Sequence, residues 1–122
     1  MSASQLPAVQ ATALQAVARL QLYEEHLRQL VGSWLDMELY QSVSAEVDNI
    51  RASCAILPGL AIPIAALVVS HADLVHCLWR NSQPGSSAGI AECDTELQEH
   101  LGNIHSLSRK CLRAAGRPDR AQ

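Results

Sequence analysis

Apolar residues recur every seven positions along the first part of the chain. One series is Leu6, Ala13, Leu20, Leu27 and Trp34, and a second, three positions later, is Val9, Ala16, Tyr23, Leu30 and Met37. Residues three and four positions apart share one face of an α-helix, so the two series form a single apolar stripe. The pattern predicts an amphipathic helix over residues 6–31.

The stripe changes its phase after Gly32 and Ser33. The next apolar set is Leu39, Val43, Val47, Ile50, Cys54 and Leu57. This set lies roughly 100–180° around the helix axis from Leu27, so one straight helix cannot bury both stripes against one partner. Ser33 and Asp36 have the spacing of a capping box, which favours a new helix start. We therefore predict a second helix over residues 34–57, ended by Pro58-Gly59.

Two further helices are predicted, over residues 60–80 and 90–115. The stripe of the third is Leu60, Ile64, Leu67, Val68, His71, Leu74, Val75 and Leu78. The stripe of the fourth is Ile90, Cys93, Leu97, Leu101, Ile104, Leu107 and Cys111. The segment between these helices is rich in Ser, Gly and Pro, which is typical of a loop.

Four helices joined by short connections predict an all-α fold, an antiparallel up-down-up-down four-helix bundle. In this interpretation residues 1–122 form a single domain, and residues 116–122 are a flexible basic tail. The alternative is a domain-swapped or intertwined dimer, in which the first break straightens into one long helix.

The predicted third helix carries a second apolar face, formed by Ile62, Ala66 and Val69. A helix that is apolar on both sides needs more cover than one seam of a small bundle provides. We therefore expect this face to contact another protein chain, and we predict a homodimer.

The composition agrees with a small helical domain and argues against several functions. Hydrophobic residues make up 48% of the chain and charged residues 17%, enough apolar material for a buried core. A net charge of −3 and an aromatic content of 3% argue against nucleic-acid binding. The apolar run over residues 55–69 is interrupted by prolines and shorter than the roughly 20 residues of a membrane span, so we expect no membrane insertion.

The N-terminal residues lack the basic and apolar regions of a secretory signal. The four cysteines, Cys54, Cys77, Cys93 and Cys111, contain no C-x-x-C pair. We therefore expect a cytoplasmic protein whose cysteines are buried, reduced thiols.

No motif for nucleotide binding, serine hydrolysis or zinc proteolysis occurs in the sequence, which favours a non-enzymatic role. Arg19 and His26 have a spacing that is similar to the R-x4–6-H signature of the HEPN ribonucleases, which implies RNA cleavage. The segment from His105 to Arg109 resembles the H-x-L-K-G core of histidine phosphotransfer domains, although Ser108 and Arg109 replace Lys and Gly. That resemblance implies phosphorylation of His105.

Two histidines occupy apolar stripes of the last two helices, where a polar side chain needs a partner. If these helices are antiparallel about a turn near Gly85, residue numbers at equal height add to about 170, as those of His71 and His100 do. A turn at Pro58-Gly59 places Glu46 at the same height. Two imidazoles and a carboxylate are the ligand set of an open site for Zn, Fe or Mn, of the kind that helical bundles hold.

The same groups also fit a hydrogen-bonded polar layer without a metal, which would fix the register of the helices. The numbers of Cys77 and Cys93 likewise add to about 170, but Cys77 lies about 120° around the helix from His71 and is left out of the predicted site. The sequence favours a non-enzymatic module for protein interaction and self-association. A metal-binding bundle using Glu46, His71 and His100 is the alternative.

Overall fold

The structure is a computed structural model that describes residues 6–32, 36–82 and 90–116. These residues form four α-helices and no strand, so the predicted all-α fold is confirmed. The helices are α1 (Leu6–Gly32), α2 (Met37–Cys54), α3 (Ala61–Ser82) and α4 (Ile90–Ala114).

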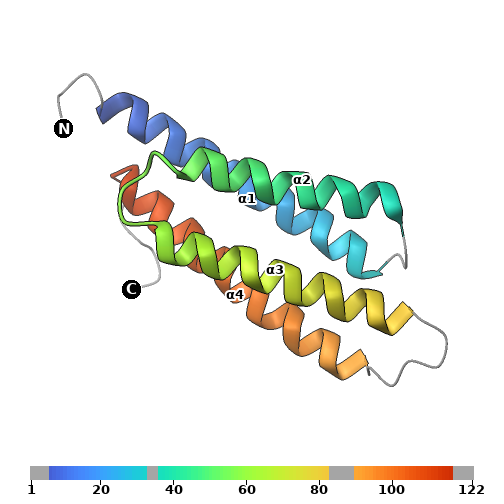
Figure 1. The fold of residues 1–122 in the computed structure, drawn as a ribbon. Helices are drawn as coiled ribbons and strands as arrows, with labels where there is room; N and C mark the ends of the chain where they lie inside the picture. The colour runs from blue at the N-terminus through green and yellow to red at the C-terminus, as the bar shows by residue number, and fades with distance from the viewer. Residues whose placement is uncertain (1–5, 33–35, 83–89, 117–122) are drawn as a thin grey trace.

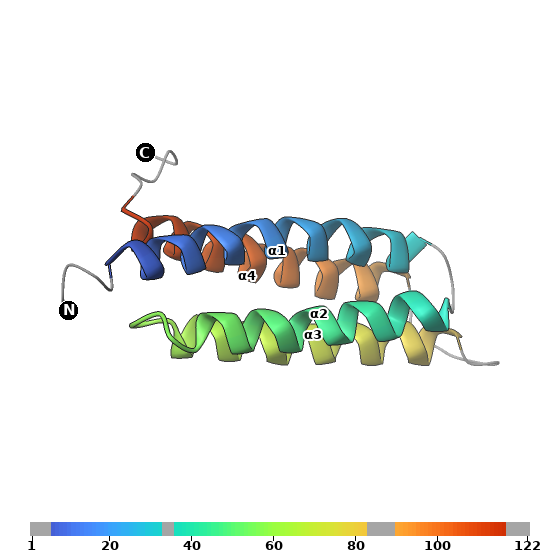
Figure 2. The same cartoon turned by 90° about the horizontal axis from the view of Figure 1, so that it is seen from above.

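Successive helices run in opposite directions and form the four corners of a bundle (Figure 1, Figure 2). α1 packs against α2 and α4, and α3 packs against α4, while α2 and α3 are the neighbouring pair that packs least closely. α1 and α3 therefore lie diagonally across the bundle, as do α2 and α4. Because α1 and α2 are separate antiparallel helices, the break after Gly32 does not straighten into one long helix.

The core is built from the apolar stripes that the sequence predicts. Every described member of the stripes is buried or half-buried, with one exception. The largest fully buried apolar side chains are Leu20, Leu27, Ile50, Leu67, Leu74, Ile104 and Leu107. Four helices thus close over one shared interior, as amphipathic helices do when each turns its stripe inward.

The exception is Met37, which is 58% exposed. The seven-residue repeat predicts Met37 in the stripe of the first helix, but it lies in the first turn of α2. Asp36 caps that turn, because its side chain accepts a hydrogen bond of 3.0 Å from the backbone N–H of Leu39. The predicted cap at Ser33, and Trp34 beside it, fall outside the described residues.

The connection between α2 and α3 is a short turn that begins earlier than expected. α2 ends at Cys54 rather than Leu57, and Gly59 has a φ of 74°, in the left-handed region that favours glycine. Pro63 lies in the first turn of α3, where its missing N–H costs no helical hydrogen bond. At the other end of the chain, the predicted basic tail falls almost entirely within residues 117–122, outside the described residues.

Candidate functional site

A cluster of polar side chains lies at the centre of the bundle and joins three helices. The hydroxyl of Tyr23 on α1 lies 2.6 Å from Nδ1 of His71 on α3 and 2.6 Å from Nε2 of His100 on α4. The two imidazole rings are 5.9 Å apart, centre to centre, which confirms that His71 and His100 lie at one height. Tyr23 and His100 are fully buried, and His71 is 8% exposed.

Two more side chains complete this cluster. Ser70 on α3 lies 2.5 Å from Nδ1 of His100, and Asn103 on α4 donates a hydrogen bond of 2.9 Å to the Ser70 hydroxyl. We call Tyr23, Ser70, His71, His100 and Asn103 the polar core cluster. No buried side-chain nitrogen or oxygen within the described residues lacks a hydrogen-bond partner, so burial of these groups is compensated.

The hydrogen bonds assign the protons within the polar core cluster. The Ser70 hydroxyl donates to the backbone carbonyl of Leu67, so its oxygen accepts from Nδ1–H of His100. Nε2 of His100 is then an acceptor, and the single hydrogen of the Tyr23 hydroxyl goes to it. The Tyr23 oxygen in turn accepts from Nδ1–H of His71. Both histidines are neutral in this arrangement.

Burial also keeps these groups uncharged. Burial, followed by the neighbouring His71, lowers the pKa of His100 to about 4. Burial lowers the pKa of His71 as well, although the negative charge of Asp48 opposes this. Burial and the charge of Glu46 raise the pKa of Tyr23 far above its ordinary value. The cluster is therefore built to hold neutral groups around neutral pH.

Glu46 does not join this cluster. Its carboxylate lies 2.5 Å from Nδ1 of His26 on α1 and accepts a hydrogen bond of 3.3 Å from the Ser42 hydroxyl. The three side chains of the predicted metal site thus lie in two hydrogen-bonded groups. Within the described part of the chain, no group of three or more His, Cys, Asp or Glu side chains is placed to hold a metal ion.

The residues behind the two family resemblances lie on the outside of the bundle. His26 is half-buried and is bonded to Glu46, whereas Arg19 is exposed. Nε2 of His105 lies 2.8 Å from the carboxylate of Glu24, which also forms an ion pair with Arg28. Burial would raise the pKa of Glu24, but the hydrogen bonds and charges of Arg28 and His105 outweigh it and lower that pKa.

The outer face of α3 is apolar and open to solvent along its first half. Ile62 is 84% exposed and Val69 is 59% exposed, and the side chain of Ala66 between them is exposed too. These residues are four and three positions apart and so share one face of the helix. We call Ile62, Ala66 and Val69 the α3 outer face. Among the described helices, only α3 is long and apolar enough to cross a membrane, judged by length and composition.

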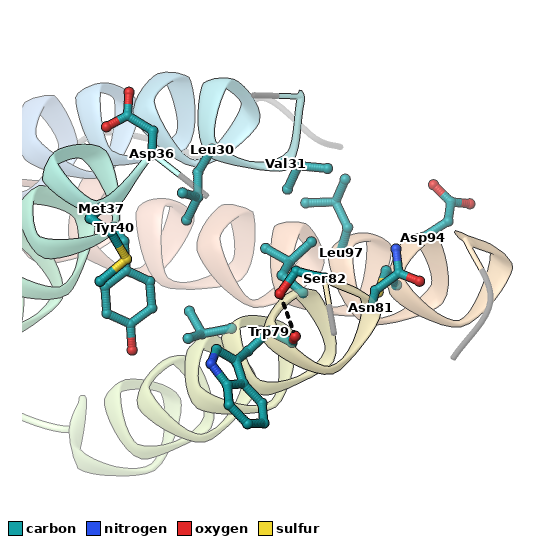
Figure 3. Close-up of a pocket in the computed structure, with 13 residues that line it drawn as sticks. Leu30, Val31, Asp36, Met37, Tyr40, Trp79, Asn81, Ser82, Asp94 and Leu97 are labelled. Carbon is teal, nitrogen blue, oxygen red and sulfur yellow. Dashed lines mark hydrogen bonds between the residues drawn. The ribbon is translucent and has the colours of Figure 1, made fainter. Parts of the chain in front are cut away.

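A pocket of about 460 Å³ opens at the end of the bundle where α1 and α3 end (Figure 3). Its apolar lining comes from all four helices: Leu30, Val31, Met37, Tyr40, Val75, Leu78, Trp79, Cys93 and Leu97. Asp36 and Asp94 lie at its edge, and the Ser82 hydroxyl donates to the backbone carbonyl of Trp79 beside it. The volume lies within the range of small-molecule sites.

Comparison of the chain with models of protein families, with curated proteins and with solved structures finds no match.

Proposed function

We propose that this protein is a helical-bundle module that associates with a second copy of itself through the α3 outer face. The observation that carries the proposal is the exposure of Ile62 and Val69, two large aliphatic side chains on one helical face. Burying a side chain of this size stabilises an interface by roughly 1.5–3 kcal/mol. A symmetric dimer uses the same patch on both partners, so the interface would bury Ile62 and Val69 of each copy.

The chemistry of the face favours a second copy as its occupant. Residues 61–72 include no Asp, Glu, Lys or Arg, so the face offers no charge that would select a charged partner. Alanines 65, 66 and 72 are exposed beside the larger side chains, and small residues let two helices approach closely. An identical apolar face complements the surface from Ile62 to Val69, and the exposed Asp73, one turn further along α3, marks the end of this face.

Sedimentation equilibrium of the full chain and of two charged variants tests the proposal. We expect a dimeric mass for the wild type and a monomeric mass for Ile62→Glu and Val69→Glu, because each dimer would bury two unpaired carboxylates. Leu22→Glu is the matched control, because Leu22 is 49% exposed on α1 and should leave the dimer intact.

A wild type that stays monomeric up to about 100 µM, equivalent to about −5.5 kcal/mol of association, would contradict the proposal. Flotation of the wild type with phosphatidylcholine vesicles, lost in Ile62→Glu, would instead assign the same face to a lipid surface.

The pocket supports a second candidate function, the binding of a small apolar molecule. Trp79 and Tyr40 are exposed at the pocket although both are large aromatic side chains. The carboxylates of Asp36 and Asp94 at its edge disfavour an anion, so the ligand class is an uncharged or cationic apolar molecule.

Quenching of tryptophan fluorescence by an uncharged apolar dye tests this function. Val75→Phe should weaken dye binding by filling the pocket, and unchanged binding would contradict the assignment.

A further inference from the structure

The cysteines of this chain lie in two pairs, each of which joins two helices. Sγ of Cys77 on α3 lies 2.6 Å from Sγ of Cys93 on α4. Near the opposite end of α4, the thiol of Cys111 neighbours that of Cys54 on α2 closely enough to lower the pKa of Cys54. All four side chains are buried reduced thiols.

The Cys77–Cys93 pair is already close to the geometry of a bond. The 2.6 Å between the two sulfur atoms exceeds the length of a disulfide bond by only about 0.6 Å. Closing that gap needs a small side-chain movement and leaves the packing of α3 against α4 in place. The two helices contact each other extensively, so their backbones hold both cysteines at this distance.

We propose that Cys77 and Cys93 form a reversible disulfide when the protein meets a low-molecular-weight disulfide such as oxidised glutathione. The thiolate of Cys93 attacks one sulfur of the reagent, and the S–S bond of the reagent breaks to release one thiolate. The thiolate of Cys77 then attacks the Cys93 sulfur and displaces the second thiolate. Two electrons pass from the cysteines to the reagent, and the two cysteine protons pass through water to the released thiolates.

Cys93 is the cysteine that the reagent reaches first. It is 6% exposed and forms part of the wall of the pocket at the end of the bundle, whereas Cys77 is fully buried. A reagent that enters the pocket therefore meets Cys93, and Cys77 stands directly behind it to complete the exchange. This order makes Cys93 the attacking residue and Cys77 the resolving residue.

The disulfide would tie α3 to α4 across their connection. A cross-link that closes a loop of about 15 residues restricts the unfolded chain and raises the ratio of folded to unfolded protein by about 100-fold. The melting temperature of the oxidised protein should therefore exceed that of the reduced protein.

Peptide mapping of the folded wild-type protein tests the proposal. Cleavage before Asp73 and Asp94 yields a peptide of residues 73–93 that contains Cys77 and Cys93 and neither of the other cysteines. The protein is incubated with glutathione mixtures at about pH 8, where thiolates form, and the remaining thiols are then alkylated. We expect this peptide to be two hydrogens lighter than its reduced form and to carry no alkyl group. Added dithiothreitol should reverse the change.

Cys77→Ser is the matched control, because it leaves Cys93 without a resolving thiol. We expect this variant to stop at a mixed disulfide of Cys93 with glutathione and to lose the rise in melting temperature. The proposal is overturned if the wild-type peptide is alkylated at both cysteines under oxidising conditions. It is equally overturned if Cys77 or Cys93 is linked to Cys54 or Cys111 instead, or if wild-type Cys93 keeps its glutathione.

Discussion

Lowering the pH from 7 to 5 should destabilise the folded chain through His100. This imidazole is fully buried, and its pKa falls from an ordinary 6.5 to about 4. Between these two values the unfolded chain binds a proton that the folded chain does not, so a falling pH favours unfolding. The stability that depends on neutral His100 is complete above about pH 6.5 and is lost progressively down to about pH 4.

The difference between the two pKa values corresponds to about 3 kcal/mol of unfolding free energy. About 2 kcal/mol of this should be lost between pH 7 and pH 5, a fall of about 30-fold in the ratio of folded to unfolded protein. Protonation of His71 at falling pH also favours unfolding, because burial lowers its pKa too. The lowered pKa of Glu24 stabilises the fold at neutral pH, and this contribution is lost mainly below pH 4.5, outside this interval.

Urea unfolding followed by far-UV circular dichroism, at one protein concentration and at both pH values, measures this loss. His100→Gln removes the titrating group and should flatten the dependence on pH. His76→Gln, on an exposed position of α3, should keep it. A wild-type change below about 0.5 kcal/mol, or an equally steep dependence in His100→Gln, would refute the assignment of a buried neutral imidazole.

Further changes test the polar core cluster and the cap of α2. Tyr23→Phe leaves two imidazole nitrogens without partners and should cost about 3 kcal/mol of unfolding free energy, whereas Tyr40→Phe at the surface should change it by less than about 0.5 kcal/mol. Nitrogen chemical shifts at pH 7.5 should show His71 and His100 both protonated on Nδ1, and an Nε2–H tautomer at either would contradict the assigned protons. Asp36→Ala should cost about 1 kcal/mol in urea unfolding, because the first turn of α2 loses its cap.

The apolar periodicity of the sequence was sufficient to predict the four helices and their core faces. Helix positions repeat every 3.6 residues, so the stripes identify which side of each helix points inward. The turn centres then set the heights of residues along the bundle, and His71 and His100 do meet. The helix ends were less accurate, because the Asp36 cap and the turn after Cys54 depend on local hydrogen bonds that a stripe does not report.

Glu46 shows that the height of a residue along the bundle does not determine which helix its side chain contacts. Counting residues from the turn places Glu46 level with His71, but its side chain bonds to His26 on α1 instead. α2 packs far more closely against α1 than against α3, so a residue at the edge of the α2 stripe faces α1. The heights come from counting residues, whereas the choice of neighbour depends on how tightly each pair of helices packs.

The sequence holds a signal that could have identified Tyr23 as a member of the polar core cluster. This residue stands in the predicted stripe of the first helix, and a tyrosine in a buried stripe needs a partner for its hydroxyl. The sequence also places Cys77 and Cys93 at matching heights, but Cys77 lies about 120° around the helix from His71. The angle excludes them from the histidine layer but not from each other, and the sulfur atoms lie 2.6 Å apart.

Isotope-filtered NMR on a sample mixed from labelled and unlabelled copies tests most directly whether α3 pairs with itself. We predict nuclear Overhauser effects between copies at the methyl groups of Ile62 and Val69, because the α3 outer face would lie against its equivalent. Self-pairing of α3 would be contradicted by Overhauser effects between copies at other methyl groups only. It would equally be contradicted by the absence of such effects in a sample of dimeric mass.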